Sequence, residues 1–257
     1  MTISLAKHVA LVTGGTKGIG KAIAEKLRKC GAKVVITARS APEETAEGFH
    51  FIAADHTVPE SAGDIAREII DTYGRIDIII NNAGANQGPG GGYNTLSDEH
   101  WQRDFDLNFL SAVRMNKALL PVMISQHSGV IIHISTGAAD KPLWDMTMTY
   151  SAAKAALNTY SKALSNELGG KGIRVNVVSP GVVKTPLMIA FLENIAAASG
   201  ISLEEAFKMV TQKVDVPLGR MSEPEEVAGL VAFLVSPEAN YITGVNYHVD
   251  GGAYPII

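Results

Sequence analysis

The sequence contains little cysteine, few aromatic residues and no long hydrophobic run. Cys30 is the only cysteine among 257 residues, so no disulfide can form within the chain, and we expect a reducing compartment, the cytoplasm. The apolar start is soon broken by glycines and no later run reaches membrane-spanning length, so neither a secretory signal nor a transmembrane helix is predicted. The net charge of -4 excludes the basic excess typical of proteins that bind nucleic acids or anionic membranes.

Motifs of metal and acyl-transfer chemistry are also missing from the sequence. The seven histidines show no H-E-x-x-H spacing and Cys30 has no partner for zinc, so we predict no metal site. No G-x-S-x-G segment provides a serine nucleophile. We interpret His133, which lies in an apolar run, as a hydrogen-bonded core residue.

What the sequence does contain is a regular alternation of short β-branched runs with helical segments. Most of the runs are continuously apolar, which indicates strands that are covered on both faces. The alternation predicts a single α/β domain, residues 1–257, with a Rossmann-like, doubly wound parallel sheet of about seven strands and ligands at the carboxyl ends of the strands. The runs are "HVALV" (8–12), "KVVITA" (33–38), "FHFIA" (49–53), "IDIII" (76–80), "VIIHI" (130–134), "IRVNVV" (173–178) and "VNYHV" (245–249).

One helical-looking segment, residues 185–220, interrupts this rhythm. It is rich in Leu, Met, Phe and Ala and follows one predicted strand while delaying the next. We interpret it as a substrate lid inserted within the domain, with a pair of amphipathic helices that seals the core as the alternative.

A glycine-rich turn follows the first predicted strand. In "TGGTKGIG", residues 13–20, Gly14, Gly18 and Gly20 permit a tight turn, close approach of the backbone to a pyrophosphate and packing of the next helix on the strand. The order strand, loop, helix is the order that dinucleotide binding requires. We therefore predict a dinucleotide site here.

The spacing G-x-x-x-G-x-G, the segment "NNAG" at 81–84 and the pair Tyr150-x-x-x-Lys154 together resemble the short-chain dehydrogenase/reductase family. The resemblance extends through "PGVVKTPL" (180–187) and "GRMSEPEEVAGLVAFLVSPEANYITG" (219–244), and so covers nearly the whole chain. It implies a nicotinamide cofactor, a homotetramer and a defined set of cofactor contacts. Those contacts are Gly14, Thr16, Lys17, Gly18, Ile19, Gly20, Arg39, Ser40, Asp55, Asn82, Ala83, Gly84, Tyr150, Lys154, Pro180, Gly181, Val183 and Thr185.

The choice between NADP and NAD depends on the end of the second strand. The position where NAD-dependent relatives carry Asp is Ala38, Arg39 follows it, and Lys17 adds a second cation in the glycine loop. An arginine grips a phosphate through paired N–H donors, so NADP is favoured, with NAD as the alternative. The resemblance also implies that Asp55 holds the adenine amino group and that Thr185 reaches the nicotinamide carboxamide.

Tyr150 and Lys154 lie four residues apart, and therefore on one face of a helix. Reduction of a ketone needs a proton donor beside the carbonyl oxygen, and a neighbouring cation lowers the pKa of a phenol. We therefore assign Tyr150 as the general acid/base and Lys154 as the group that tunes it. By resemblance, Asn108 supports a proton relay and a hydroxyl binds the substrate oxygen, supplied by Thr136 or, if the loop shifts by one residue, by Ser135.

Apolar side chains close to Tyr150 and Thr185 predict a mostly apolar substrate pocket. It is expected to take a ketone or secondary alcohol, and the sequence does not distinguish a 3-oxoacyl thioester from a sugar, steroid or aryl ketone. The hypothesis is an NADP-dependent oxidoreductase of the carbonyl or 3-oxoacyl reductase type. The alternatives are an NAD-dependent alcohol dehydrogenase of the same family and a nucleotide-binding regulator with impaired catalysis. The predicted substrate residues are Asn86, Trp144, Met146, Leu187, Met188 and Phe191.

Overall fold

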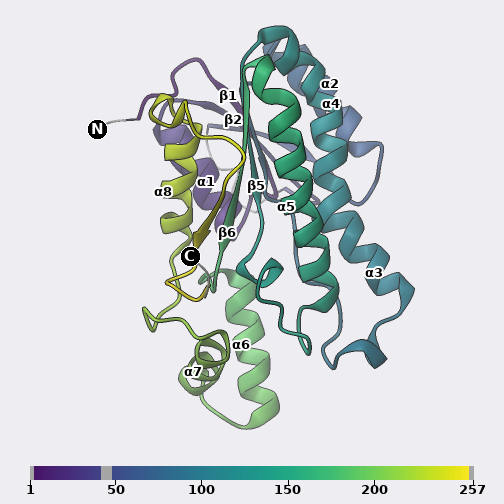
Figure 1. Cartoon of the computed structure of the whole chain (residues 1–257), viewed down its shortest axis with the longest axis vertical. Coiled ribbons are helices and arrows are strands. Elements are labelled where there is room, and N and C mark those ends of the chain that lie inside the picture. The colour runs from purple at the N-terminus through teal and green to yellow at the C-terminus, as the bar shows by residue number, and fades with distance from the viewer. Residues whose placement is uncertain (1–2, 42–47, 255–257) are drawn as a thin grey trace.

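A single parallel sheet of seven strands forms the centre of the protein (Figure 1). The computed structural model describes residues 3–41 and 48–254, so the outermost ends of the predicted domain lie outside the described residues. The strands follow the order β3-β2-β1-β4-β5-β6-β7, and all seven predicted strands are confirmed. They are β1 (Val9–Thr13), β2 (Lys33–Ala38), β3 (Phe49–Ala53), β4 (Ile78–Asn81), β5 (Gly129–Ile134), β6 (Ile173–Pro180) and β7 (Asn246–Val249).

The sheet changes direction of winding between β1 and β4. Successive crossovers from β1 proceed to β2 and β3 on one side, whereas β4, β5, β6 and β7 follow on the other side. Every residue of β1 and of β4 is buried, which explains why these strands are continuously apolar rather than alternating. The connections after β1 and β4 lead to helices on opposite faces of the sheet, and in such sheets the ligand crevice lies between them at the carboxyl edge.

Helices cover both faces of the sheet (Figure 1). On one face, α1 (Gly18–Lys29) packs beside α8 (Pro224–Val235), and their apolar side chains form one core cluster with strand residues such as Val12. On the other face, α2 (Ser61–Tyr73), α4 (Ser111–Gln126) and α5 (Met148–Leu168) form a second cluster with strand residues such as Leu11. Adjacent residues of β1 thus enter opposite cores, as the period of two in a strand requires.

Two further helical regions lie toward the carboxyl edge of the sheet. Helix α3 (Asp98–Phe105) continues through a π-helical turn, Asp106–Leu110, into α4. After β6, α6 (Pro186–Ser199) and α7 (Leu203–Val214) project beyond the sheet and share a small apolar cluster of their own (Figure 1). The segment predicted to be a lid, residues 185–220, contains both helices. In the described part of the chain no single helix has the length and hydropathy to span a membrane, although α6 and α7, bent by 108°, meet that criterion as a pair.

Candidate active site

The glycine turn after β1 is packed against the loop that follows β4. Gly14 has φ +65°, and a Cβ there would lie 3.1 Å from Asn82 Nδ2. A Cβ on Gly20 would lie only 2.3 Å from the Gly14 carbonyl oxygen, and one on Gly18 would lie 3.1 Å from Thr185 Cγ2. The three predicted glycines therefore do permit close approach of backbone segments.

Helix α1 begins within this turn without a side-chain cap. Its N-cap residue, Lys17, makes no capping hydrogen bond, and its first turn contains no acidic residue. The backbone N–H groups and the positive end of the helix dipole are therefore available to an anion. This is the arrangement expected for the pyrophosphate of a dinucleotide.

Two predicted contacts lie at the ends of β2 and β3. Arg39 follows β2 and is exposed, and its charge helps to lower the pKa of Asp55, an effect smaller than that of the hydrogen bonds from Thr57. Asp55 Oδ1 accepts those bonds from the Thr57 N–H (2.9 Å) and hydroxyl (2.7 Å). The arginine expected at a ribose phosphate and the carboxylate expected at adenine are thus electrostatic neighbours.

The loop after β4 brings three predicted residues to the same edge. Asn82 Nδ2 donates to the carbonyl oxygens of Thr13 and Gly14, at 2.8 and 3.2 Å. The next two residues of this loop are Ala83 and Gly84. A Cβ on Gly84 would lie 2.8 Å from Asn108 Oδ1 and 3.0 Å from Lys154 Nζ. Because Gly84 has no side chain, Asn108 Oδ1 and Lys154 Nζ can lie this close to the loop.

The remaining predicted cofactor residues lie in the glycine turn, after β2, at the end of β6 and at the start of α6. Thr185 caps α6, its hydroxyl accepting a 3.2 Å hydrogen bond from the Met188 N–H. Val183 is 4% exposed and its side chain belongs to the core, so only its backbone can face a cofactor. The others are Thr16 and Ile19 in the turn, Ser40 after β2, and Pro180 and Gly181 at the end of β6.

Helix α5 presents Tyr150 and Lys154 one turn apart. Lys154 Nζ lies 6.0 Å from the centre of the Tyr150 ring and donates a 2.8 Å hydrogen bond to the carbonyl of Ile134, the last residue of β5. Lys154 is only 2% exposed, so its ammonium is held in place by the end of the sheet.

The protonation of this pair is governed mainly by burial. Burial raises the pKa of Tyr150 to about 12, the Thr136 side chain lowers it in part, and the charge of Asp104 raises it further. Burial also lowers the pKa of Lys154 to about 8. Removal of water from the phenol thus sets the direction of the pKa shift of Tyr150, and the lowering of this pKa by Lys154, 6.0 Å from the ring, stays a prediction.

Asn108 lies in the π-helical turn between α3 and α4. Its Oδ1 accepts a 3.0 Å hydrogen bond from the Ala85 N–H, and its Nδ2 donates to the Ala85 carbonyl at 2.9 Å. The side chain therefore pairs with the backbone of the loop after β4, beside Gly84. Single π turns inside helices are frequent at functional sites, since they shift the register of the helix locally.

Thr136 and Ser135 occupy different environments at the end of β5. Thr136 lines a hollow between the end of β6, α6 and the loop after β7, and its hydroxyl accepts a 3.2 Å hydrogen bond from the Ala138 N–H. The Ser135 side chain is buried and has no hydrogen-bond partner in the described residues. Thr136 thus lines the hollow, whereas the Ser135 side chain lies in the interior.

The hollow at Thr136 contains few of the predicted substrate residues. Met188 lines it, whereas Phe191 packs into the cluster between α6 and α7. Trp144 is 68% exposed and Leu187 64% exposed, so both lie at the surface. Asn86 instead donates from Nδ2 to the Met146 carbonyl at 2.9 Å, which ties two loops together. The sequence reasoning missed other residues that line the hollow: Lys141, Leu143, Val182, Val214, Asp250, Ala253 and Tyr254.

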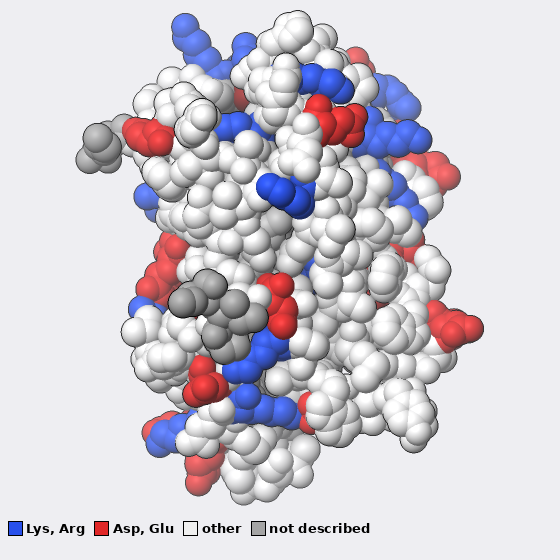
Figure 2. Space-filling model, in the orientation of Figure 1, with Lys and Arg blue, Asp and Glu red and all other residues white. Residues whose placement is uncertain are grey.

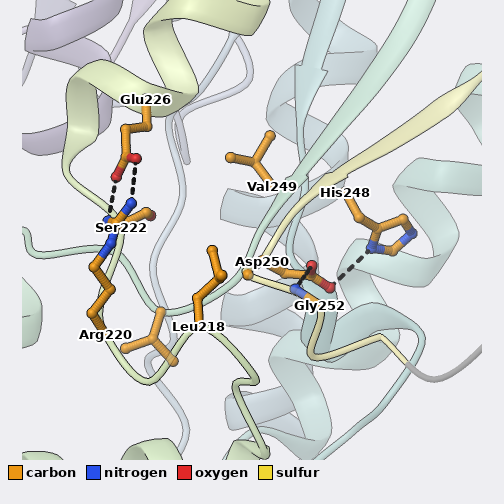
Figure 3. Close-up of a pocket in the computed structure, with 10 residues that line it drawn as sticks. Leu218, Arg220, Ser222, Glu226, His248, Val249, Asp250 and Gly252 are labelled. Carbon is orange, nitrogen blue, oxygen red and sulfur yellow. Dashed lines mark hydrogen bonds and ion pairs between the residues drawn. The ribbon is translucent and has the colours of Figure 1, made fainter.

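A second hollow lies on the other side of the loop after β7 (Figure 3). Arg220 is already paired there with both oxygens of Glu226, each at 2.7 Å. Asp250 lines both hollows, accepts hydrogen bonds from the backbone of its own loop, and faces His248, with Nδ1 and Oδ2 3.8 Å apart. Asp250 thus shapes the loop that closes the hollow at Thr136.

One buried carboxylate, Asp104, was also missed. It is fully buried on α3, four residues before Asn108. The only signal in the sequence is the i, i+4 spacing of the two residues, which predicts that they share a helix face.

The prediction for His133 is confirmed: it is fully buried and hydrogen-bonded to Asn116 and Ser161, and burial lowers its pKa to about 3. Among residues 3–41 and 48–254, no group of three or more His, Cys, Asp or Glu side chains is arranged to hold a metal ion.

The fold and the convergence of these loops define a dinucleotide-dependent oxidoreductase. A family model described as Enoyl-(Acyl carrier protein) reductase matches residues 14–254. The chain belongs to the short-chain dehydrogenase/reductase family and is an NAD(P)-dependent oxidoreductase acting on CH–OH groups.

Relatives of known name cover the whole chain. A 3-oxoacyl-(acyl-carrier-protein) reductase from Vibrio cholerae is 36% identical over 265 residues, which are 99% of this chain and 100% of the relative. The structure of L-sorbose reductase from Gluconobacter frateurii with NADPH and L-sorbose superposes with a TM-score of 0.93, at 33% identity and 100% coverage of both chains. Aldohexose dehydrogenase from Thermoplasma acidophilum has a TM-score of 0.88 at 30% identity, covering 99% of this chain and 98% of its own.

Proposed function

We propose that this protein is an NADP-dependent reductase of the carbonyl or 3-oxoacyl type, which interconverts a ketone and a secondary alcohol. The observation that carries the proposal is the approach of Lys154 Nζ and Asn108 Oδ1 to Gly84, within 3.0 Å of where its Cβ would lie, beside the glycine turn. We infer from this that the proton donor on α5 and the dinucleotide site lie together at the carboxyl edge of the sheet, where this fold binds ligands.

Three observations support NADP. No acid occupies the end of β2, where Ala38 stands, and Arg39 follows directly. Lys17 contributes a second cation at the start of α1. The related L-sorbose reductase was solved with NADPH, so we extend that cofactor to this chain. The groups that would hold it are the N–H groups at the start of α1 for the pyrophosphate, Arg39 for the ribose phosphate and Thr185 for the carboxamide.

The cofactor would supply the hydride, and the protein supplies the proton. Because burial raises the pKa of Tyr150 to about 12, the phenol is protonated at neutral pH and can act as the acid in ketone reduction. The Thr136 hydroxyl would hold the substrate oxygen, and the fixed Lys154 ammonium would stabilise the phenolate that proton donation leaves. Asn108, through its hydrogen bonds to Ala85, keeps the loop at Gly84 close to the Lys154 ammonium. It would also support proton relay.

The hollow at Thr136 supports a substrate with an apolar body and a few polar groups. Leu143, Val182 and Met188 supply apolar walls, while Lys141 and Asp250 stand at its edges. We propose that the segment 185–220 covers this substrate as a lid. A 3-oxoacyl compound and a ketose, the substrate types of two of the named relatives, are the first two classes to test.

We also propose a cytoplasmic homotetramer. Figure 2 shows few charged side chains across the centre of the face that carries β7 and α5. Phe233, Tyr241 and Val245 are exposed apolar residues near the β7 edge, and an exposed apolar edge of a sheet is a site for contact between subunits.

A cofactor and substrate screen tests the proposed function. We expect the wild-type protein to bind NADPH more tightly than NADH and to oxidise NADPH with at least one ketone from a panel that includes ethyl 3-oxobutanoate and ketoses. Tighter binding of NADH would favour the NAD-dependent alternative, and tight NADPH binding without turnover would favour a nucleotide-binding regulator. A matched pair of variants assigns the hydroxyl: Thr136→Ala should lose turnover, whereas Ser135→Ala should keep it.

A further inference from the structure

Asp104 places a carboxylate between the loop after β4, the π-helical turn and the start of α5. The residue is fully buried, and its Oδ1 accepts hydrogen bonds from the Gln87 N–H at 3.2 Å and from Asn108 Nδ2 at 3.3 Å. Its Oδ2 accepts a short hydrogen bond from the Thr149 hydroxyl. Each oxygen therefore has a donor, and all three donors are neutral groups.

These donors come from three segments that build the active site. Gln87 belongs to the loop after β4, which pairs with Asn108 through Ala85. Asn108 lies in the π-helical turn, and Thr149 lies in the first turn of α5, directly before Tyr150. The carboxylate therefore links the start of the helix that carries the proton donor to the loop beside Gly84.

The negative charge has no cation in contact. No Lys, Arg or His nitrogen lies within 4.0 Å of its oxygens in the part of the chain that the structure describes. The nearest cation on its own helix, Arg103, instead donates to Gln87 Oε1 at 3.1 Å. Burial of a charge with neutral partners alone is costly, and an asparagine could meet the same three donors, because a threonine hydroxyl can accept as well as donate. Structural linkage alone therefore does not account for a carboxylate at this position.

The group that this charge acts on is the phenol of Tyr150. The elements packed against α5 also carry Asp98, Glu99, His100 and Arg103 on α3, Asp106 in the π-helical turn, His133 on β5 and, on α5 itself, Lys154. Asp106 is paired with Arg114 at 2.8 Å, and the loop between Ala85 and Gln87 contributes no charge. Asp104 is the carboxylate that raises the pKa of Tyr150.

We propose that Asp104 is a positioning residue for proton transfer, whose hydrogen bonds fix the first turn of α5 against the loop after β4 and place a negative charge against Thr149, the residue before Tyr150. The inference rests on the proposed function of Tyr150. In alcohol oxidation Tyr150 must first be deprotonated, so kcat for oxidation falls toward acid pH. The pH at which it falls, the acid limb of the profile, is set by the pKa of Tyr150. Removal of the Asp104 charge should move that limb.

The experiment compares the pH dependence of kcat for oxidation of ethyl 3-hydroxybutanoate, or of the alcohol product of the most active panel ketone, in four proteins. Asp104→Asn should shift the acid limb to lower pH and raise kcat at pH values below the wild-type limb. Thr149→Val keeps the charge but removes one hydrogen bond, so it should lower kcat at every pH without moving the limb. The matched control is Asp106→Asn. Asp106 lies two residues further along the same helical segment, and its carboxylate pairs with Arg114 at 2.8 Å. The acid limb of kcat in this variant should lie at the same pH as in the wild type.

A limb in Asp104→Asn at the same pH as in the wild type and in Asp106→Asn would overturn the inference. If Asp104→Asn does not fold, Asp104→Ser removes the same charge with a smaller side chain, and the same shift is required of it. A different result would overturn the proposed function. If Tyr150→Phe retains full turnover, both the role of Tyr150 and the role of Asp104 are refuted. If Tyr150→Phe loses turnover but the acid limb does not move in Asp104→Asn, only the role of Asp104 is refuted.

Discussion

Replacement of Lys154 by methionine should stabilise the folded protein at neutral pH and abolish turnover. Lys154 is 2% exposed, and its burial lowers its pKa from 10.5 to about 8. The folded protein therefore bears the free-energy penalty of a buried ammonium. Methionine has a similar length and no charge, so Lys154→Met removes that penalty together with the group that would stabilise the Tyr150 phenolate.

The size of the effect follows from the pKa of Lys154. A fall from 10.5 to about 8 corresponds to about 3 kcal/mol, from which about 1 kcal/mol is subtracted for the lost hydrogen bond to the Ile134 carbonyl. The free energy of unfolding at pH 7 should thus rise by about 2 kcal/mol. Because the pKa is lowered on folding, the unfolded chain binds more protons between pH 8 and 10.5. The penalty is fully present below about pH 8 and disappears as the pH approaches 10.5.

Urea denaturation at pH 7 and at pH 10 measures this difference. Lys154→Met should gain stability over the wild type at pH 7 and lose most of that gain at pH 10. The control is Lys162→Met on the exposed side of the same helix, which should change the free energy of unfolding by less than about 0.5 kcal/mol. A Lys154→Met variant that is less stable than the wild type at pH 7 would instead show that the ammonium stabilises the fold, contrary to this prediction.

Three further predictions concern the turn, the cofactor and acid stability. Gly84→Ala places a Cβ 2.8 Å from Asn108 Oδ1 and should cost about 1–3 kcal/mol of stability and most of kcat. Gly63→Ala, which meets nothing within 4 Å, should be neutral or stabilising in the same urea assay, and equal effects of the two would contradict the packing argument. Arg39→Ala should raise the Kd for NADPH about tenfold or more with little change for NADH, measured by fluorescence titration; equal changes would exclude a phosphate contact. The pKa of His133 is lowered from 6.5 to about 3, so the free energy of unfolding of the wild type should fall by about 2 kcal/mol between pH 6.5 and 5. His133→Gln should reduce this loss. The same dependence on pH in the variant as in the wild type would contradict the prediction.

The strands were predictable because their pattern is local and strong. Every apolar run that was expected to be a strand is one, since strands buried on both faces exclude polar residues along their whole length. Helices α6 and α7 lie within residues 185–220, the segment that looks helical in the sequence. Its role could not be predicted in the same way, because a lid and a core-sealing helix pair have similar apolar patterns.

The candidate site was predictable where backbone geometry forces the residue type. Gly14, Gly20 and Gly84 each stand where a Cβ would meet another segment, so the pattern of glycines reports the close approach directly. The residues of the substrate hollow were not predictable. Lys141 and Asp250 lie more than a hundred positions apart and meet only because the loop after β7 returns to the end of β5.

The protonation of the catalytic pair was the other point that sequence spacing could not give. The i, i+4 spacing correctly placed Tyr150 and Lys154 on one face, but it contains no information on burial. Removal of water raises the pKa of Tyr150, and the buried carboxylate of Asp104 acts in the same direction. A pKa depends on the whole surroundings of a group, which only the folded chain provides.

The assignment of Tyr150 as proton donor is tested most directly by a single-turnover measurement with Tyr150→Phe, in which NADPH fluorescence follows both binding and oxidation by the most active panel ketone. We expect the variant to bind NADPH with the wild-type Kd and to oxidise it at least a hundredfold more slowly, because the proton donor alone is missing. Wild-type rates of NADPH oxidation in this variant would show that another group donates the proton, and would contradict the assignment of Tyr150.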